Sequence, residues 1–421
     1  MRNLLSPLSA LRYLAGTAAV LTVVTPLLEA QESIRPSLAG SMASEARRTA
    51  APPFIYNLKA GPVIFDLNGS FDIEFNDNIN LSENNRRADI ILRPGLELNS
   101  LWQVTPINAL RFDLGISYAA YLDHSRNNPD TILIAPNSQL SFDIFVGDFK
   151  INLHDRFSIL QDPLDDISIS NTEDFTRFQN DAGISVLWDL NDVKLVLGYD
   201  HYNFKAIGGD FNYLDRSEEQ FSFSAAFRLS DVNTVGIDAG TALIDYDESF
   251  NNDGVTYQVG AFVESTLTNY LRLRLAVGYQ GISFDTGASN GDSSDSSSPY
   301  AVLTLAHRLN PYVTETLTAG RETRLGLTTN SIDLTFARYT ASWRLNPTIT
   351  LNFDAFFEDA DESGGFFSEN AQRYGGGVSF DYRLTQKLVV GVRYQYILKD
   401  SDLDNRDYYQ NRVGVHFNYN F

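Results

Sequence analysis

Hydrophobic and polar residues alternate along most of the chain from about residue 62 onward. The last residues show the pattern best, because Val413, Val415, Phe417, Tyr419 and Phe421 share one parity and mostly polar residues fill the other. Alternation with period two puts one set of side chains on each face of a β-strand. The chain is therefore predicted to be all-β, with strands that are apolar on one face and polar on the other.

Short turns recur at regular spacing between these strands. Six of them, from Leu190-Asn191 to Leu384-Thr385, begin with leucine and lie 36 to 42 residues apart, and two less regular turns lie near Pro106 and Gly147. Strict alternation of short turns with long loops is typical of transmembrane barrels. The longer polar segments between the turns include residues 162–174, 245–254 and 285–298.

Eight short turns and nine long loops predict about eighteen strands, with sixteen as the alternative. Propeller blades of four short strands would need three turns per repeat, and here each repeat holds two strands. A closed sheet also satisfies every backbone group inside a bilayer, which a soluble sandwich does not need to do. The predicted fold is a transmembrane antiparallel up-and-down β-barrel with short periplasmic turns and long extracellular loops.

The same pattern divides the chain into three segments. Residues 1–30 are interpreted as a signal peptide, because Arg2 and Arg12 precede an apolar run over residues 14–28. A later cleavage near Ala39 and an uncleaved anchor are the alternatives, although the run is shorter than the ~20 residues of a spanning helix. Residues 31–61 are predicted to be a periplasmic leader, and residues 62–421 to be the barrel.

Composition narrows the chemistry. The 421 residues include 53 acidic and 32 basic side chains, for a formal charge of -21, which argues against a nucleic-acid partner. The chain has no cysteine, which rules out disulfides, thiolate metal sites and lipid-modified cysteines. Its five histidines are scattered without metal-ligand or nucleophile spacing. We therefore expect no cofactor and no enzymatic activity, with an outer-membrane hydrolase that uses a Ser, a His and an orienting polar residue as the alternative.

Charged residues of both signs fall on the inward parity of the predicted strands. In a water-filled pore such residues set ion selectivity, whereas the alternative is that they simply pair across the wall. Those that precede a short turn are expected to ring the periplasmic mouth. The candidates for lining the lumen are Asp72, Glu74, Glu97, Arg111, Asp113, Lys150, Lys194, Asp200, Arg228, Asp238, Glu264, Arg272, Arg274, Arg344, Asp354, Asp381, Arg383, Arg393 and Arg412.

Acidic clusters occupy several predicted loops, at residues 162–166, 245–248, 358–362 and 400–404. They are expected to form a solvated acidic rim that favours cations at the entrance. Carboxylate groups also suit calcium, so loop-bound divalent cations such as calcium are the alternative, but no cluster has the spacing of an EF-hand loop.

Two segments depart from the clean alternation. Ile332, Leu334 and Phe336 have the opposite parity to the outward residues that follow them, which predicts a β-bulge near Arg338 or a strand that runs past the membrane. In the next strand back, Glu315 and Arg321 fall on the nominal lipid face, where charge is costly at mid-bilayer.

Two segments also resemble known proteins. Residues 408–421 are similar to the C-terminal strand of bacterial outer-membrane proteins, whose terminal Phe, here Phe421, is read by the barrel-assembly machinery. Ala60-Gly61-Pro62-Val63 and the residues from Glu74 to Ile79 resemble the opening of a family of putative β-barrel porins that often accompany exopolysaccharide systems. The resemblance implies the outer membrane, with lipid and lipopolysaccharide around the barrel. It also implies the assembly machinery as a partner, with exopolysaccharide machinery and a homotrimer as further alternatives.

These observations predict an outer-membrane porin-like channel for passive diffusion of small hydrophilic solutes, with a modest preference for cations. One alternative is a barrel associated with exopolysaccharide export. The other is a structural surface barrel without an open pore.

Overall fold

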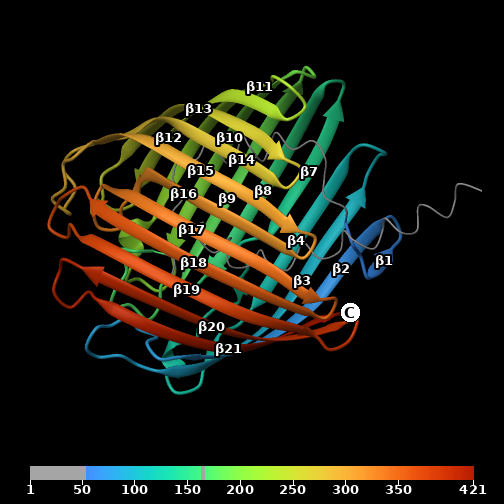
Figure 1. The fold of residues 1–421 in the computed structure, drawn as a ribbon. Helices are drawn as coiled ribbons and strands as arrows, with labels where there is room; N and C mark the ends of the chain where they lie inside the picture. The colour runs from blue at the N-terminus through green and yellow to red at the C-terminus, as the bar shows by residue number, and fades with distance from the viewer. Residues whose placement is uncertain (1–53, 163–165) are drawn as a thin grey trace, which may run out of the picture.

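The strands of the computed structural model curl into a single closed antiparallel β-barrel (Figure 1). The structure describes residues 54–162 and 166–421, so the predicted signal peptide and residues 31–53 of the predicted leader lie outside it. The strands are β1 (Leu58–Ala60), β2 (Val63–Asn76), β3 (Asp89–Gln103), β4 (Ala109–Ser117), β5 (Ala120–Tyr121), β6 (Leu133–Ile134), β7 (Gln139–Val146), β8 (Phe149–Leu160), β9 (Arg177–Asp189), β10 (Val193–Ala206), β11 (Arg216–Arg228), β12 (Asn233–Tyr246), β13 (Gly254–Thr268), β14 (Leu271–Phe284), β15 (Ser296–Asn310), β16 (Val313–Leu325), β17 (Ser331–Asn346), β18 (Ile349–Glu362), β19 (Asn370–Arg383), β20 (Leu388–Ser401) and β21 (Tyr408–Asn420).

The wall contains eighteen strands over the described residues, as the count of turns predicted. β4 and β5 pair with β3 in one continuous register and act as a single strand. β6 and β7 likewise form one strand between β4 and β8. β1 adds a short hairpin with β2 outside the ring of wall strands, within the segment predicted to be leader.

The ring closes between the first and last wall strands. β2 pairs antiparallel with β21 from Asn68↔Asn420 to Asn76↔Arg412. At the C-terminus the Phe421 amide donates a hydrogen bond to the Leu67 carbonyl at 3.2 Å, and its ring packs edge-on against Tyr419 at 5.2 Å. Closure leaves no strand edge unpaired along this junction, which is the condition for a sheet in hydrocarbon.

Short turns and long loops lie at opposite ends of the barrel. The eight predicted turns each join consecutive wall strands, and Asn191 adopts a positive φ of 67°, which asparagine tolerates in tight turns. The connections at the other end are longer and include two 3₁₀ turns, Ser125–Asn127 and Asn212–Leu214. The alternation expected of a transmembrane barrel is therefore present along the described chain.

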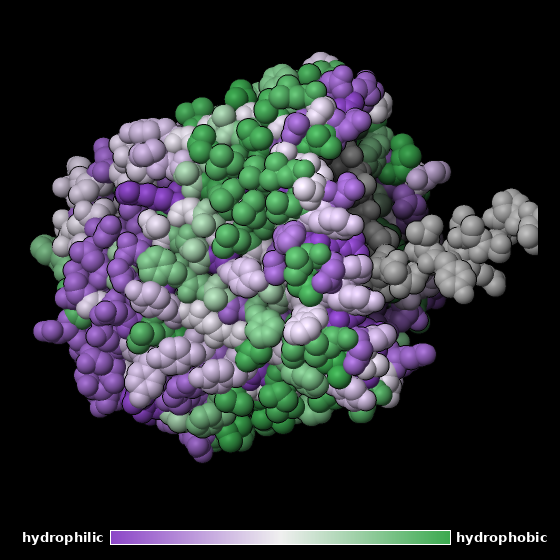
Figure 2. Space-filling view, in the orientation of Figure 1, coloured by the Kyte–Doolittle hydropathy of each residue, from purple (hydrophilic) through white to green (hydrophobic). Residues whose placement is uncertain are grey.

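The outer face is apolar around the middle of the barrel. Figure 2 shows hydrophobic residues gathered across the centre of one face and hydrophilic residues at the loop end. Exposed residues such as Phe221, Val277 and Val392 make up this surface, with Tyr257 and Tyr279 nearer the loops. Tyrosines at such a boundary suit the membrane interface. Among the described residues, no helix is long and apolar enough to cross a bilayer.

The predicted bulge in β17 is wrong. β17 pairs with β16 and β18 without interruption from Ile332 to Arg344, and its one register shift lies beyond Arg344. Ile332, Leu334 and Phe336 therefore keep their parity and face the interior, where they are buried. They are apolar because they pack against Ile167 inside the lumen. Periodicity alone does not reveal such a contact.

The two charges on the lipid face of β16 do face outward. Each has a partner, because His307 Nδ1 lies 3.4 Å from Glu315 and Arg321 Nη2 lies 2.9 Å from Asp333. Glu315 lies two residues from the start of β16, whereas Arg321 lies four residues from its end. Each ion pair offsets part of the cost of placing charge on the lipid face.

Candidate functional site: the barrel lumen

The strand registers put all nineteen predicted lumen residues on one face of the wall. Lys194, for example, is linked through successive cross-strand partners to Phe262, Glu358 and Lys399, which are buried inside the barrel. Because cross-strand partners share a face, the whole row points inward. The lumen is therefore lined by charged and polar side chains.

Glu74 is the centre of one charged cluster. Its carboxylate accepts hydrogen bonds from Arg412 Nη2 at 2.8 and 2.9 Å and from Arg412 Nε at 3.0 Å. Arg393 Nη2 reaches the same carboxylate at 3.2 Å, and Glu74 itself is only 2% exposed. Two guanidinium groups thus neutralise one buried acid, on strands that meet only because the barrel closes.

Many of the other predicted charges also pair along the wall. Lys150 lies 3.2 Å from Asp143, and Arg274 lies 3.1 Å from Glu264 and 3.7 Å from Asp238. The remaining ion pairs of predicted residues are Lys194 with Asp189, Asp200 with His154, Arg228 with Asp192, and Asp381 with His416. Pairing across the wall, left open by the sequence, describes these residues better than a ring of free charges.

A few predicted residues keep polar atoms without a partner. Arg111 Nη2 and Arg344 Nε are buried and make no hydrogen bond to any residue that the structure describes. Glu97 accepts hydrogen bonds from the amides of Asn99 and Asn137, at 3.3 and 3.2 Å. Arg228 and Arg383 are exposed at strand ends next to short turns, where the sequence placed the periplasmic mouth.

A second charged cluster was missed at the sequence level. Glu358 pairs with Arg338 at 2.8 Å and with Arg373 at 2.6 Å. Glu369 pairs with Lys399 at 2.7 Å and with Arg406 at 2.8 Å. Strand parity could have found Arg338, Arg373 and Lys399, whereas Glu369 and Arg406 sit outside the strands and carry no such signal.

The residues described between β8 and β9, 161–162 and 166–176, lie inside the barrel and are here called the crossing loop. β8 is the fifth wall strand, and Ile167 packs among Ile332, Leu334, Phe336 and buried alanines of β18 and β19, on the opposite side of the ring. The described residues of the crossing loop therefore contact opposite sides of the barrel interior.

Hydrogen bonds hold the far end of the crossing loop. Ser168 Oγ donates to Glu362 Oε1 at 2.6 Å, and Lys399 Nζ donates to Ser170 Oγ at 3.0 Å. Asn171 Nδ2 donates to the Asn405 carbonyl at 2.8 Å. The loop is thus tied to β18, β20 and the β20–β21 connection.

Two of the expected rim clusters lie partly in the interior. Asp162 of the crossing loop pairs with Arg93 at 3.2 Å, and Asp166 of the same loop is buried. Burial raises the pKa of the Asp166 carboxyl, although the Ser168 amide donates to it at 2.7 Å. Glu358 is also interior. The expectation of a solvated acidic rim is wrong for residues 166 and 358, whereas Asp400, Asp402 and Asp404 are exposed.

An apolar cluster fills the loop end of the lumen. It joins side chains from β10, β12, β14, β16, β20 and β21 with residues of the crossing loop and three other connections, so it extends across the mouth. We call it the mouth core, and it consists of Leu81, Ile169, Phe175, Tyr202, Phe204, Leu214, Ile244, Tyr246, Ile282, Phe284, Leu325, Leu327, Ile397 and Tyr408.

The opposite half of the lumen is more open to solvent. Inward residues near the short turns, such as Asp66, Asn68 and Lys194, are partly exposed, and Arg272 is exposed. Within residues 54–162 and 166–421, no three histidine or acidic side chains converge as a metal site requires. The loop-bound calcium considered from the sequence stays a prediction.

A family model described as putative beta-barrel porin 2 matches residues 58–421. The chain belongs to this porin family. Membership and fold together imply the bacterial outer membrane and a porin-like channel fold, and the family is one of channels rather than enzymes. The expectation drawn from residues 60–63 and 74–79 is confirmed at the level of the family.

Solved structures similar to this porin come from other outer-membrane proteins. Pseudomonas aeruginosa OccK2 (OpdF) is 10% identical, with a TM-score of 0.50 and coverage of 85% of this chain and 98% of that chain. Acinetobacter baumannii OccAB3 is 11% identical, with a TM-score of 0.49 and coverage of 85% and 99%. At such identities the likeness to OccK2 shows the fold alone. No curated protein matches the sequence.

Proposed function

We propose that this porin lets small hydrophilic solutes diffuse passively across the outer membrane, with a modest preference for cations. The observation that carries the proposal is the inner wall, where charged and polar side chains face a partly solvated half-lumen inside a ring of eighteen strands. Barrel diameter grows with strand number, and a ring of this size encloses more space than wall side chains alone fill.

The crossing loop would set the size limit of such a channel. Its Asp162 pairs with Arg93 on one side of the barrel, and its Ser168 and Ser170 bind Glu362 and Lys399 on the other. A solute passing the loop would meet ion pairs that are already neutralised, so the pore itself would select weakly by charge. The preference for cations would come from exposed acidic residues of the outer loops.

Conductance and solute flux test this proposal. Purified protein in planar bilayers should give discrete ion-conducting steps with a reversal potential on the cation side. Liposomes carrying it should swell in small sugars and stop swelling as sugar size increases. Bilayers that stay silent together with liposomes that never swell would rule the proposal out, and anion selectivity would overturn its second part.

The mouth core favours a second candidate, a surface barrel without an open pore. Its apolar side chains are buried, with Leu81 and Phe204 both 0% exposed. A barrel of this kind would not conduct ions as the wild-type protein. It would also not conduct ions in a variant whose crossing loop is released from the wall. Lipopolysaccharide, the assembly machinery and exopolysaccharide machinery stay proposed partners of either barrel.

A further inference from the structure

The barrel wall forks between β15 and β16 at the loop end. These strands pair only from Asn310↔Val313 to Ala301↔Arg321. Beyond that point β15 continues along β14 as far as Ser296, whereas β16 continues along β17 as far as Leu325. The outer ends of two neighbouring strands are therefore held by their other neighbours and not by each other.

Two residues of the fork suit the separation of the two strands. Pro299 lies on the unpaired part of β15, opposite Tyr279 of β14, and proline has no N–H to give to a ladder, so it is found at strand edges. Gly320 lies next to the branch point, where a Cβ atom would be 2.5 Å from the Ala301 carbonyl oxygen. Only glycine lets β16 pass this close to β15 as it turns away.

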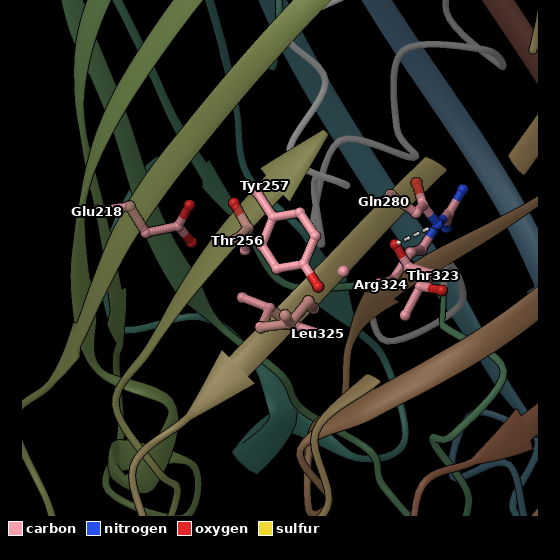
Figure 3. Close-up of a pocket in the computed structure, with 9 residues that line it drawn as sticks. Glu218, Thr256, Tyr257, Gln280, Thr323, Arg324 and Leu325 are labelled. Atoms are coloured by element: carbon pink, nitrogen blue, oxygen red, sulfur yellow. Dashed lines mark hydrogen bonds between the residues drawn. The ribbon is translucent and has the colours of Figure 1, made fainter. Parts of the chain in front are cut away.

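Side chains close the fork in place of the ladder. Gln280 Nε2 of β14 donates to the Thr323 carbonyl at 3.5 Å, and the hydroxyls of Ser298 and Thr323 lie 2.9 Å apart. Figure 3 shows Gln280 and Thr323 at one side of a small cavity whose other side carries Glu218. Two side-chain contacts are weaker than the backbone bonds they replace, so the end of β16 is held less firmly on its β15 side than on its β17 side.

The cavity and the wall around it are electrically neutral. Arg324 is bound by Glu322 at 2.8 Å, and Glu218 by Arg216 and Gln220, each at 2.8 Å. Between their ion pairs, the inner faces of β11, β13, β14 and β15 also carry a group of buried amides and hydroxyls. These neutral residues are Gln220, Ser222, Ser224, Thr256, Gln258, Gln280 and Ser298.

We propose that the fork is the passage by which small neutral polyhydroxylated solutes, such as monosaccharides, get past the mouth core. The proposal rests on the proposed function and names its solute class. When the outer end of β16 swings away from β15, the hydroxyls and amides at the fork exchange their own hydrogen bonds for bonds to the solute. A charged solute gains no counter-charge there and loses hydration, so it is disfavoured.

The absence of cysteine gives a direct test. In the double variant Ser298→Cys and Thr323→Cys, oxidation should join the two strands across the fork, because the native hydroxyls are in contact. Liposomes should then lose swelling in monosaccharides and recover it on reduction. The matched control is Thr304→Cys with Thr318→Cys, a paired position in the intact ladder of the same strands. Its oxidation should leave swelling unchanged.

The outcomes separate the two proposals. Wild-type liposomes that pass no solute would defeat the proposed channel and this inference with it. If wild-type liposomes swell and the oxidised double variant swells equally, the channel stands and only this inference is defeated. Failure of the disulfide to form in a folded barrel would contradict the contact at the fork.

A second variant covers the case in which the cysteine pair does not fold. Gln280→Ala removes one of the two contacts that close the fork and one hydrogen-bonding group of the passage. We expect the ratio of monosaccharide flux to flux of a charged solute of similar size to change by about fivefold. An unchanged ratio would contradict the inference.

Discussion

Glu74 shows how a buried charge is accommodated in this wall. The carboxylate lies on β2, and its partners Arg393 and Arg412 lie on β20 and β21, so more than 300 residues separate them in sequence. Sequence parity put all three side chains on the inner face, but only the closed ring brings them together. A buried ion pair of this kind is costly to break, because the remaining charge stays buried.

Glu74→Gln should therefore destabilise the barrel while keeping its shape. Two guanidinium groups would lose their shared counter-charge, and we expect a loss of about 3 kcal/mol in the free energy of unfolding. Urea unfolding in detergent micelles measures it. Arg228→Gln is the control, since that side chain is half exposed at the rim and should change the value little. Equal stability of the Glu74 variant and wild type would refute the structural role of this cluster.

A second residue-scale prediction concerns Asp292, in the loop between β14 and β15. Burial opposes its ionisation, but hydrogen bonds from Ser363, Asn330 and Ser294 outweigh burial and hold the pKa of Asp292 below its ordinary 3.8. Because the pKa is lowered in the folded protein, ionised Asp292 stabilises the loops at any pH above its ordinary pKa. This stabilisation is lost as the pH falls through the lowered pKa of the folded state.

Asp292→Asn should therefore loosen these loops at neutral pH. Hydrogen exchange over residues 285–295 and 326–330 should be faster in the variant than in wild type at about pH 7. The difference should vanish at low pH, where wild-type Asp292 is protonated too. A difference that persisted unchanged in acid would show that ionisation of Asp292 is not its cause.

At the scale of elements, the crossing loop is the part most directly open to experiment. Ile167 anchors it by packing on β17 to β19. Ile167→Ser should cost about 2 kcal/mol of that contact and release the loop from the far wall. Single-channel conductance in planar bilayers should increase. Ile132→Ser, at an exposed loop position, is the control, and a conductance equal to wild type in both variants would argue against the loop as the constriction.

The sequence predicted the wall better than the lumen, for a physical reason. Strands were found because a lipid-facing surface imposes period two on every one of them, and turns because they interrupt that period. The path of a loop leaves no such trace. Asp162 and Asp166 were assigned to an acidic rim because nothing local distinguishes a loop that enters the lumen from one that leaves it.

The path of the crossing loop also explains why the sequence predicts a bulge in β17 that the structure does not have. Apolar side chains at Ile332, Leu334 and Phe336 contradicted an inner face that was assumed to be wet, so a bulge was the simplest local explanation. The contradiction was in fact a sign of the crossing loop. An inward run of apolar residues at the loop end of a strand could serve as a signal for such a loop in other barrels.

Over the whole molecule, acidic residues exceed basic ones by 21. Some of the exposed acidic residues lie on the loops. Charges on the lumen wall largely cancel in pairs, so long-range attraction of ions should come from the loop end. Salt screens such attraction, with a Debye length of about 10 Å at 0.1 M and about 3 Å at 1 M.

Replacing Asp400, Asp402 and Asp404 by Asn should therefore reduce the preference for cations without altering the size of the conductance steps. Reversal potentials under a salt gradient give the permeability ratio, which should move toward one in the variant. Raising the salt concentration should have a similar effect on wild type. A ratio that is independent of both changes would place selectivity in the lumen.

The junction of β2 with β21 has a consequence for how the molecule is made. β21 follows every other wall strand in the sequence, so the sheet has two unpaired edge strands until β21 reaches β2. Unpaired edges favour pairing with other chains, and contacts between residues so distant in sequence form slowly. The chain therefore needs protection from aggregation until the ring closes, and a truncation that removes β21 would leave the edge of β2 permanently unpaired.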